Sequence, residues 1–260
     1  MFKIGKRDFS TFIKRIFKIE NYLAIIRFFS IHKKPLKRIV NEILSSGTYP
    51  KSLRFNTPTG THQTRLYSPD DFSTFNLIFC RKDYLHKNKH KVILDIGSNI
   101  GISAIYWLTR NNKTIVYCYE PSSDNYQKLK KNLIQFEGRF FLYKKAVSST
   151  SFVTYLNLDK SGVYNTINNN QKVNFLKKEK CDVLSINNCI EDIIKKHGKI
   201  DMIKIDNEGE ELKTVASIDK KFWNIINCLN VDGESVKELV PKIFHYSKVG
   251  SAQRFLKNDK

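Results

Sequence analysis

Short apolar runs alternate with amphipathic stretches along the chain from about Lys91 onward. Runs rich in Val and Ile predict strands, and they lie at Val92–Leu94, Thr114–Tyr119, Phe140–Lys144, Met202–Ile205 and Ile225–Val231. Apolar residues recur at helical spacing near Ile102–Arg110, Ser123–Phe136, Ser185–Lys196 and Glu210–Ile218. This alternation favours parallel strands joined by right-handed helical crossovers. The pattern therefore predicts an α/β fold with a doubly wound, mostly parallel sheet flanked by helices.

Other elements are predicted around this core. Leu53–Asn56 and Thr61–Leu66 flank a Pro- and Gly-containing turn and predict a hairpin. A helix is expected from about Phe72 to Tyr84, and an additional strand at Ser151–Leu158. The Asn-rich stretch Lys160–Asn174 is expected to form a loop over the functional site.

The first 46 residues have a pattern of their own. Apolar residues recur at helix-like spacing from Phe2 to Ile19, and Tyr22–Ile31 and Pro35–Leu44 follow as two further helical segments. Gly47 and Pro50 mark a boundary. We therefore divide the chain into a basic helical extension, residues 1–50, and a main domain, residues 51–260, with its α/β core at about 91–235.

The charge of the chain is strongly positive, with a formal net charge of +20. The first 50 residues hold 11 Lys and Arg against 3 Asp and Glu. No apolar run approaches the ~18–20 residues of a membrane span, and the features of a signal peptide are missing. A basic amphipathic extension can lie on an anionic membrane, at the inner surface of the cell membrane. It can also pack as a cap on the rest of the chain, which is our preferred interpretation.

The five cysteines are scattered, and most fall in apolar runs without a C-x-x-C pair. That usage is typical of reduced, buried thiols and predicts a cytoplasmic protein with no disulfide framework and no zinc site.

The ten residues from Val92 to Gly101 read V-I-L-D-I-G-S-N-I-G. A strand, a Gly-containing turn and a helix start form a nucleotide-type site, because glycine lets the backbone approach a ligand closely. Glu120 ends the next predicted strand, where an acid can hold the two hydroxyls of a ribose. The alternative is an ordinary strand–turn–helix unit with a chance acid.

The glycine spacing argues against a dinucleotide. G-x-G-x-x-G is missing, and Asp95 stands two residues before Gly97. A carboxylate there would repel a pyrophosphate but suits a cationic ligand that carries an amino acid. The pattern resembles the S-adenosylmethionine site of Rossmann-like methyltransferases.

A second motif, K-I-D-M-I-K-I-D-N-E-G-E-E from Lys199 to Glu211, narrows the resemblance. Together with D-I-G-S-N-I-G, Y-E-P-S-S-D-N and K-K-A-V-S, it is similar to the FkbM family of methyltransferases, over roughly residues 50–235. The resemblance implies S-adenosylmethionine as cofactor and methylation of hydroxyls on sugars and polyketides. It also implies that an antiparallel strand pair closes the sheet, which we expect to be abbreviated because the chain ends soon after Val231.

The resemblance assigns cofactor-binding residues. Asp95, Gly97 and Gly101 would take the methionine end, with Asn99 shaping the turn. Glu120 would hold the ribose. Ala146 and Val147 would lie near the adenine.

The acceptor side is expected at the acidic turn after Met202–Ile205. Clustered carboxylates raise one another's pKa toward the range of a general base. Asp206 is our first choice for that role, followed by Glu208, with Glu210 and Glu234 nearby. The same acids could instead hold Mg²⁺ or cap the next helix, and no metal is assigned.

Lys204, inside the preceding strand, has two readings. Desolvation could lower its pKa and make it a base, or it pairs with a neighbouring acid.

We therefore predict an O-methyltransferase acting on a sugar, a polysaccharide or a small hydroxylated metabolite. Acids at the acceptor side would repel phosphate, which disfavours nucleic acid. Two alternatives stay open: an RNA methyltransferase, because of the basic charge, and a non-catalytic glycan- or membrane-binding module that retains the fold.

Overall fold

The computed structural model describes residues 3–4, 7–8, 19–37, 48–84, 86–87, 89–159, 162, 165–167 and 177–257. The chain forms two compact units, Met1–Lys82 and Asp83–Lys260, which are described separately below. The predicted boundary at residue 50, between the basic extension and the main domain, is a different division of the chain and stays a prediction.

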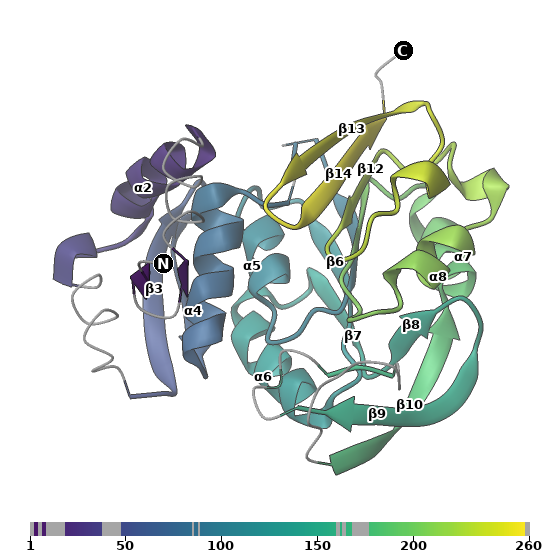
Figure 1. The fold of residues 1–260 in the computed structure, drawn as a ribbon, viewed down its shortest axis with the longest axis horizontal. Helices are drawn as coiled ribbons and strands as arrows, with labels where there is room; N and C mark the ends of the chain where they lie inside the picture. The colour runs from purple at the N-terminus through teal and green to yellow at the C-terminus, as the bar shows by residue number, and fades with distance from the viewer. Residues whose placement is uncertain are drawn as a thin grey trace. The chain divides into compact units, whose positions relative to one another are not determined.

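The first unit combines helices with a hairpin (Figure 1). Its elements are β1 Lys3–Ile4, β2 Arg7–Asp8, α2 Ile19–Ile31, β3 Lys51–Thr57, β4 Gly60–Leu66, α4 Pro69–Asn76 and the π-helical turn η1 Leu77–Arg81. The hairpin β3–β4 and the second helical segment are as predicted. Phe55, Phe75 and Phe79 pack together at ring-centroid distances of 4.1–5.1 Å and form its aromatic core.

Two predictions for this unit need correction. The helix expected at Phe72–Tyr84 begins earlier, at Pro69, because Ser68 caps it and proline fits the first turn. It ends at Arg81, since Lys82 has a φ of 62°. Lys3–Ile4 and Arg7–Asp8 pair as short antiparallel strands, although both lie in the segment from Phe2 to Ile19 that was predicted to be helical. The remainder of the first helical segment, and all of Pro35–Leu44 beyond residue 37, lie outside the described residues.

The second unit is built on a seven-stranded sheet in the order β13-β14-β12-β11-β5-β6-β7. Its strands are β5 Val92–Ile96, β6 Ile115–Tyr119, β7 Phe140–Tyr143, β11 Met202–Ile205, β12 Cys228–Val231, β13 Phe244–Val249 and β14 Ala252–Lys257. The five from β5 to β12 pair in parallel, and the strand order reverses between β5 and β11. This confirms the predicted doubly wound, Rossmann-like fold.

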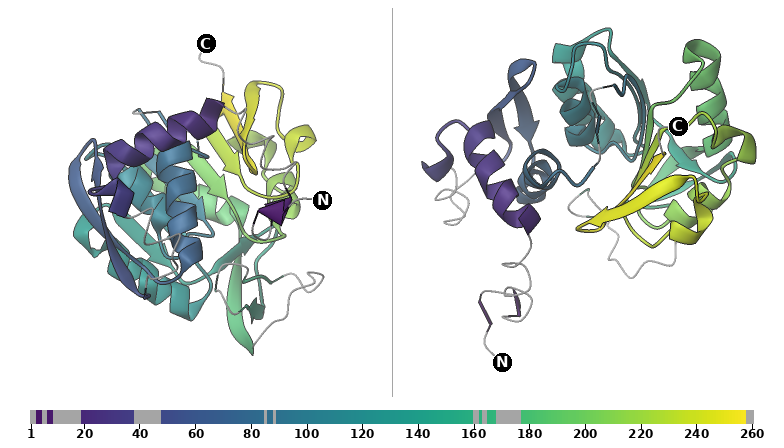
Figure 2. Two further views of the ribbon diagram at one scale, coloured as in Figure 1. Left: turned by 60° about the vertical axis from the view of Figure 1, so that its left-hand side comes forward. Right: turned by 90° about the horizontal axis from the view of Figure 1, so that it is seen from above.

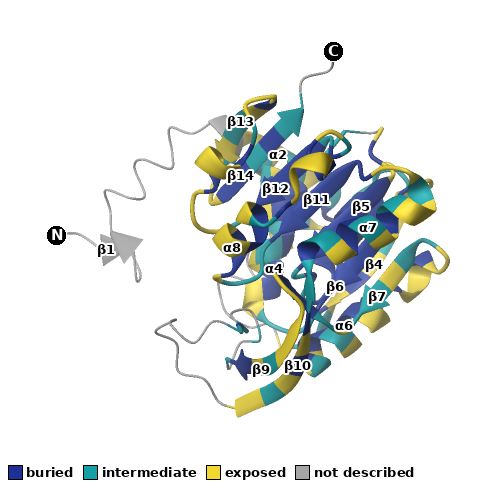
Figure 3. Ribbon diagram, turned by 90° about the vertical axis from the view of Figure 1, so that its right-hand side faces the viewer, coloured by how far each residue is buried: buried dark blue, intermediate teal, exposed yellow. Residues whose placement is uncertain are grey.

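Helices cover both faces of this sheet (Figure 1). They are α5 Ile102–Leu108 and α6 Ser123–Leu133 on one face, and α7 Ile186–His197 and α8 Glu211–Ala216 on the other. Short 3₁₀ turns, η2 Ile134–Phe136, η3 Lys220–Phe222 and η4 Lys237–Leu239, complete the unit. All residues of β5, β11 and β12 are buried (Figure 3), as expected of strands covered on two sides.

The expectation of an abbreviated sheet end was wrong. β13 and β14 form a full antiparallel pair around Gly250 and Ser251, and β14 inserts antiparallel beside β12 (Figure 2, yellow). Six residues per strand suffice because the turn between them is only two residues long.

A smaller sheet lies beside the large one, in the order β8-β10-β9. It comprises β8 Ala146–Ser148, β9 Phe152–Leu158 and β10 Lys177–Ser185. β9 confirms the additional strand predicted at Ser151–Leu158, whereas β10 was not predicted. Among the described residues, no helix is long and apolar enough to cross a membrane.

Candidate active site

The turn between β5 and α5 packs directly on the end of β11. The backbone N–H groups of Gly97 and Ser98 both donate to the carbonyl of Tyr119, at 3.0 Å. Gly97 has a φ of 74°, and a Cβ there would stand 1.8 Å from the carbonyl oxygen of Asp206. Glycine is therefore required for the turn to approach β11 so closely. Gly101 is the N-cap of α5, at a φ of 93°, and a Cβ at this position would come too close to the side chain of Leu129 in its present position.

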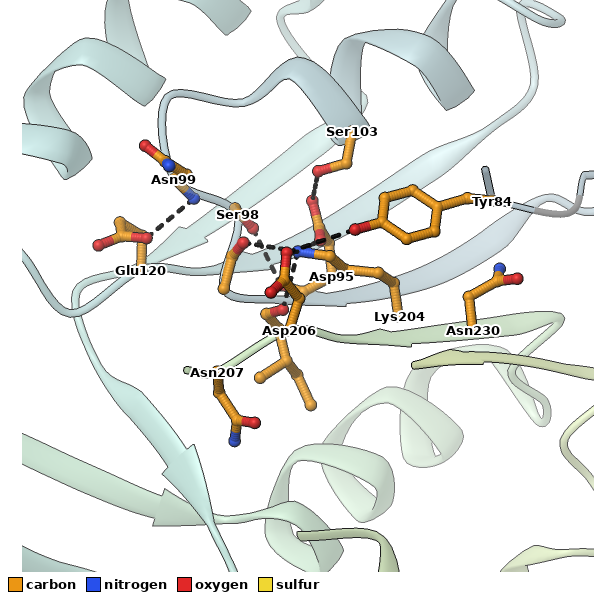
Figure 4. A network of polar contacts seen from close by, with 12 residues as sticks. Tyr84, Asp95, Ser98, Asn99, Ser103, Glu120, Lys204, Asp206, Asn207 and Asn230 are labelled. Atoms are coloured by element: carbon orange, nitrogen blue, oxygen red, sulfur yellow. Dashed lines mark hydrogen bonds and ion pairs between the residues drawn. The ribbon is translucent and has the colours of Figure 1, made fainter. Parts of the chain in front are cut away.

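Glu120 follows β6 and ties this turn to the start of the next helix (Figure 4). Its carboxylate accepts hydrogen bonds from the backbone N–H of Asn99, at 2.8 Å, and of Ser122, at 3.0 Å. Burial raises the pKa of Glu120 to about 7, although these N–H groups stabilise the charged form. Asn99 adopts a left-handed backbone conformation in this turn, at a φ of 49°.

A chain of buried polar groups connects this cofactor-side turn with the acceptor-side acids (Figure 4). The ammonium of Lys204 lies 3.5 Å from Asp95 Oδ1 and 3.2 Å from Asp206 Oδ2. It also donates to the carbonyl oxygens of Ile96, at 3.2 Å, and Gly97, at 2.6 Å. Ser103 Oγ donates to Asp95 Oδ2 at 2.7 Å. The carboxylate of Asp95 is fully buried, so it supports the turn through Lys204 and Ser103.

The ion pairs decide between the two readings of Lys204. Burial lowers the pKa of its ammonium, but the carboxylates of Asp206 and Asp95 outweigh that effect and raise the pKa above its ordinary value. A general base must be unprotonated near neutral pH, and a lysine with a raised pKa keeps its proton there. Lys204 therefore acts as an ion-pair partner, the second of the two interpretations, and holds Asp206 in place.

Tyr84 is a member of the site that sequence reasoning missed. Its hydroxyl donates to Asp206 Oδ2 at 3.3 Å, and its ring lies 5.8 Å from the Lys204 ammonium. Burial, followed by the charge of Asp206, raises the pKa of Tyr84 well above its usual range, so it stays a donor. Together, Tyr84 and Lys204 orient one oxygen of Asp206, whose side chain is 31% exposed.

Glu208 stands two residues beyond, in a backbone conformation that side chains rarely adopt, at a φ of 50°. The hydroxyl of Thr166 donates to the carbonyl oxygen of Glu208 at 2.6 Å. Thr166 belongs to the Lys160–Asn174 segment, so the described part of that segment does reach this turn. Burial and the charges of Asp206 and Glu211 raise the pKa of Glu208 to about 8.

The remaining acids divide into two groups. Glu210 accepts hydrogen bonds from Ser148 Oγ, at 2.7 Å, and Lys213 Nζ, at 2.9 Å. Glu211 accepts from the backbone N–H groups of residues 207 and 209, and so holds the acidic turn together at the start of α8. These two acids hold the turn before α8 together, but Glu210, the N-cap residue, makes no side-chain capping hydrogen bond, so the capping alternative is not what the structure shows. The charge of Asp232, after β12, also contributes to the raised pKa of Glu208, while Glu234 is exposed.

Ala146 and Val147 are buried in β8, and Val147 connects β8 with the end of β11. Its carbonyl oxygen accepts a hydrogen bond from Asn207 Nδ2 at 2.8 Å. The structure thus places β8 at the same edge of the sheet as the glycine turn and the acids. Within the described residues, no group of three His, Cys, Asp or Glu side chains is arranged to hold a metal ion.

The sequence from Asp95 to Phe244, which contains this whole edge except Tyr84, matches the methyltransferase FkbM domain. The chain belongs to the FkbM methyltransferase family. Since the match covers more than half of the chain, methyl transfer is the chemistry that this FkbM domain performs. No curated protein matches its sequence significantly.

Solved structures with a similar fold include several methyltransferases. A putative caffeoyl-CoA O-methyltransferase from Staphylococcus aureus is 15% identical, over 92% of this chain and 99% of that chain, with a TM-score of 0.39. A putative RNA methyltransferase from Pyrococcus horikoshii is 14% identical, over 74% and 87%, with a TM-score of 0.36. M. capricolum TrmK, in complex with S-adenosylhomocysteine, is 18% identical, over 66% and 64%, with a TM-score of 0.35. At these values the likeness carries no conclusion about the substrate of this FkbM domain.

Proposed function

We propose that this protein transfers a methyl group from S-adenosylmethionine to a hydroxyl of a sugar, a glycan or another hydroxylated metabolite. The observation that carries the proposal is the direct contact of the glycine turn with Asp206, where the strand order reverses between β5 and β11. Ligands of doubly wound sheets bind at such a switch point. A cofactor held at the turn and an acceptor held at the acids would therefore meet.

The donor set suits the adenosyl part of the cofactor. Glu120 accepts one backbone N–H on each oxygen and a further hydrogen bond from the side chain of Asn125, and a carboxylate has about four acceptor positions, so capacity remains for a ribose hydroxyl. The backbone of Gly97, Asn99 and Gly101 turns in the left-handed region. Gly97 and Gly101, on the turn that Asp95 supports, would take the methionine end, and Ala146 and Val147 would lie near the adenine.

S-adenosylmethionine supplies, when bound, a methyl carbon that is activated by the positive sulfur. The protein must orient the acceptor oxygen and accept the proton that leaves it as the new carbon–oxygen bond forms and the carbon–sulfur bond breaks. We assign proton acceptance to Glu208, because a group whose pKa lies near the working pH is the more effective base. Asp206, held by Tyr84 and Lys204, accepts a hydrogen bond from the acceptor and orients it.

This assignment modifies the sequence-based preference for Asp206 as base. One oxygen of Asp206 already interacts with the Lys204 ammonium and the Tyr84 hydroxyl, so these two donors fix its position. Glu208 stands two residues further along the same turn. Both acids remain candidates for the acceptor side, with different roles.

The test measures cofactor binding and transfer separately. Binding of S-adenosylhomocysteine is followed by calorimetry, and transfer of a labelled methyl group is followed on a panel of sugars, oligosaccharides and RNA. Glu208→Gln and Asp206→Asn should each keep the affinity within about threefold while turnover falls by roughly 10²–10⁴-fold. Glu238→Gln, the same change at an exposed acid, should alter neither quantity.

Three outcomes would overturn parts of the proposal. Absence of S-adenosylhomocysteine binding would remove the cofactor assignment. Methyl transfer to RNA, with none to any sugar, would replace the acceptor class. Unchanged turnover in Glu208→Gln would remove that residue as the base.

A further inference from the structure

Helix α2 is anchored to the first unit by one of its faces. Arg27 Nη1 donates to the carbonyl oxygen of Cys80 at 3.0 Å, so the charge of this arginine is directed toward η1. The ring of Phe28 contacts the ring of His32 in a tilted arrangement, with 4.2 Å between the ring centroids, and His32 Nε2 lies 3.1 Å from Asn76 Oδ1. Arg27 and His32 are thus used for contacts inside the unit.

The opposite face of α2, the long purple helix of Figure 2, carries apolar side chains that are exposed. Tyr22, Ile25, Ile26 and Phe29 follow one another at spacings of three and four residues, which places them in one stripe along the helix. Their side chains are 51%, 56%, 66% and 44% exposed, and the neighbouring Leu23 is 41% exposed. A surface helix of a globular protein normally shows its polar residues there. A contiguous exposed apolar stripe indicates an interaction surface.

Positive charge lies at the end of the same helix. Lys33, Lys34 and Lys37 are exposed directly after α2, and Leu36 among them is 67% exposed. Residues 21–41 contain no Asp or Glu. The surface formed by the apolar stripe and these three lysines, which we call the α2 surface, is therefore apolar along its length and cationic at its end.

We propose that the α2 surface docks on an anionic lipid bilayer. The helix would lie in the plane of the membrane, with Ile25 and Ile26 at the acyl boundary and Tyr22 and Phe29 at the level of the headgroups. The three lysines would contact anionic headgroups, because the negative potential of such a surface attracts basic side chains close to it. A protein partner or a second copy of the chain would also cover the apolar stripe. Neither explains the three lysines beside the stripe, whereas an anionic bilayer accounts for both features.

The experiment uses the full chain and vesicle co-sedimentation. Vesicles of about seven parts phosphatidylcholine to three parts phosphatidylglycerol are compared with pure phosphatidylcholine vesicles. We expect binding to the anionic vesicles only, weakening as the salt rises from about 0.1 M to about 0.5 M. Ile25→Ser with Ile26→Ser should weaken binding by about tenfold or more, because both side chains lose their transfer into the bilayer.

A matched control removes equally exposed apolar side chains elsewhere. Val153→Ser with Tyr155→Ser changes residues of β9 that are 58% and 60% exposed, and should bind vesicles like the unmodified protein. Circular dichroism checks that both double variants are folded. In a second measurement, Ile26→Cys carries an environment-sensitive fluorophore, which is selective because all five native cysteines are buried. Its emission should shift to the blue with anionic vesicles.

The proposal is overturned if the protein binds neither vesicle at low salt, or if the Ile25/Ile26 and Val153/Tyr155 variants behave alike. It is also overturned if the fluorophore emission does not move. If the unmodified chain sediments as a dimer and the Ile25/Ile26 variant as a monomer, a second copy covers the stripe instead.

Discussion

Replacing Lys204 by methionine removes the cation from a space that retains two carboxylates. The side chain of Lys204 is 2% exposed and lies within 3.5 Å of Asp95 and 3.2 Å of Asp206. Methionine fills a similar volume but neither neutralises these groups nor donates to the carbonyl oxygens of Ile96 and Gly97. Breaking a buried ion pair by removing one partner typically costs about 3–5 kcal/mol. We expect Lys204→Met to lower the free energy of unfolding by that amount.

The pairing also predicts how a second change acts. Burial raises the pKa of Asp95, and the charge of Lys204 opposes that effect. Without the lysine, the two carboxylates repel each other, so removing one charge should help. Asp206→Asn in the Lys204→Met background should recover about 1–3 kcal/mol relative to the sum of the two single changes.

Urea denaturation, followed by tryptophan fluorescence, measures these differences. Both tryptophans, Trp107 and Trp223, lie in the second unit and report on its unfolding. Lys213→Met is the matched control, because Lys213 pairs with Glu210 at 2.9 Å but is 64% exposed. It should cost below about 1 kcal/mol. Equal losses for Lys204→Met and Lys213→Met would refute the reasoning from burial.

Two further predictions concern the cofactor side. Burial raises the pKa of Glu120 in the ligand-free protein to about 7, and ribose hydroxyls that donate to its carboxylate would favour the charged form. The affinity for S-adenosylhomocysteine should therefore weaken below pH 7, by up to about tenfold per pH unit. Calorimetry between about pH 5.5 and 7.5 should show this dependence of affinity on pH. The Glu120→Gln variant should bind S-adenosylhomocysteine weakly and with an affinity that does not change over this pH range. An affinity of the unmodified protein that is independent of pH would contradict the assignment of Glu120 to the ribose. Gly97→Ala would press its Cβ against the Asp206 carbonyl and should destabilise the second unit by more than about 2 kcal/mol in urea denaturation. Gly138→Ala, at a similar φ but in open space, should cost about 1–2 kcal/mol, and equal losses would show that backbone strain alone requires glycine.

The central strands could be predicted from sequence because burial on both faces makes them continuous apolar runs. β5, β6 and β11 each read that way, and the residues that end them, such as Glu120 and Asp206, could be placed at one edge by topology alone. The glycines were recognised from their spacing. Glycine is required at position 97, however, because the turn contacts the end of β11, and a contact between segments so far apart in the sequence cannot be predicted from a local pattern.

Elements with one exposed face were harder to recognise. β10 begins with Lys177 and carries further charged side chains on its exposed face, so its apolar content is low. The pair β13–β14 mixes polar and apolar residues, and its one usable signal was the Gly250–Ser251 turn. Tyr84 could not be found at all, because it stands in an irregular segment and its partner Asp206 is 122 positions away in the sequence.

The buried group Asp95, Lys204 and Asp206 has a consequence for how this protein can change over generations. Lys204 and Asp95 are almost completely buried, whereas the side chain of Asp206 is 31% exposed, and the one ammonium pairs with both carboxylates. Loss of Lys204 alone would leave two carboxylates without their cation, which selection would remove, whereas loss of one acid leaves the lysine paired with the other. Descendants should therefore lose Lys204 only together with one of its two acids, whereas the exposed acids can vary one at a time.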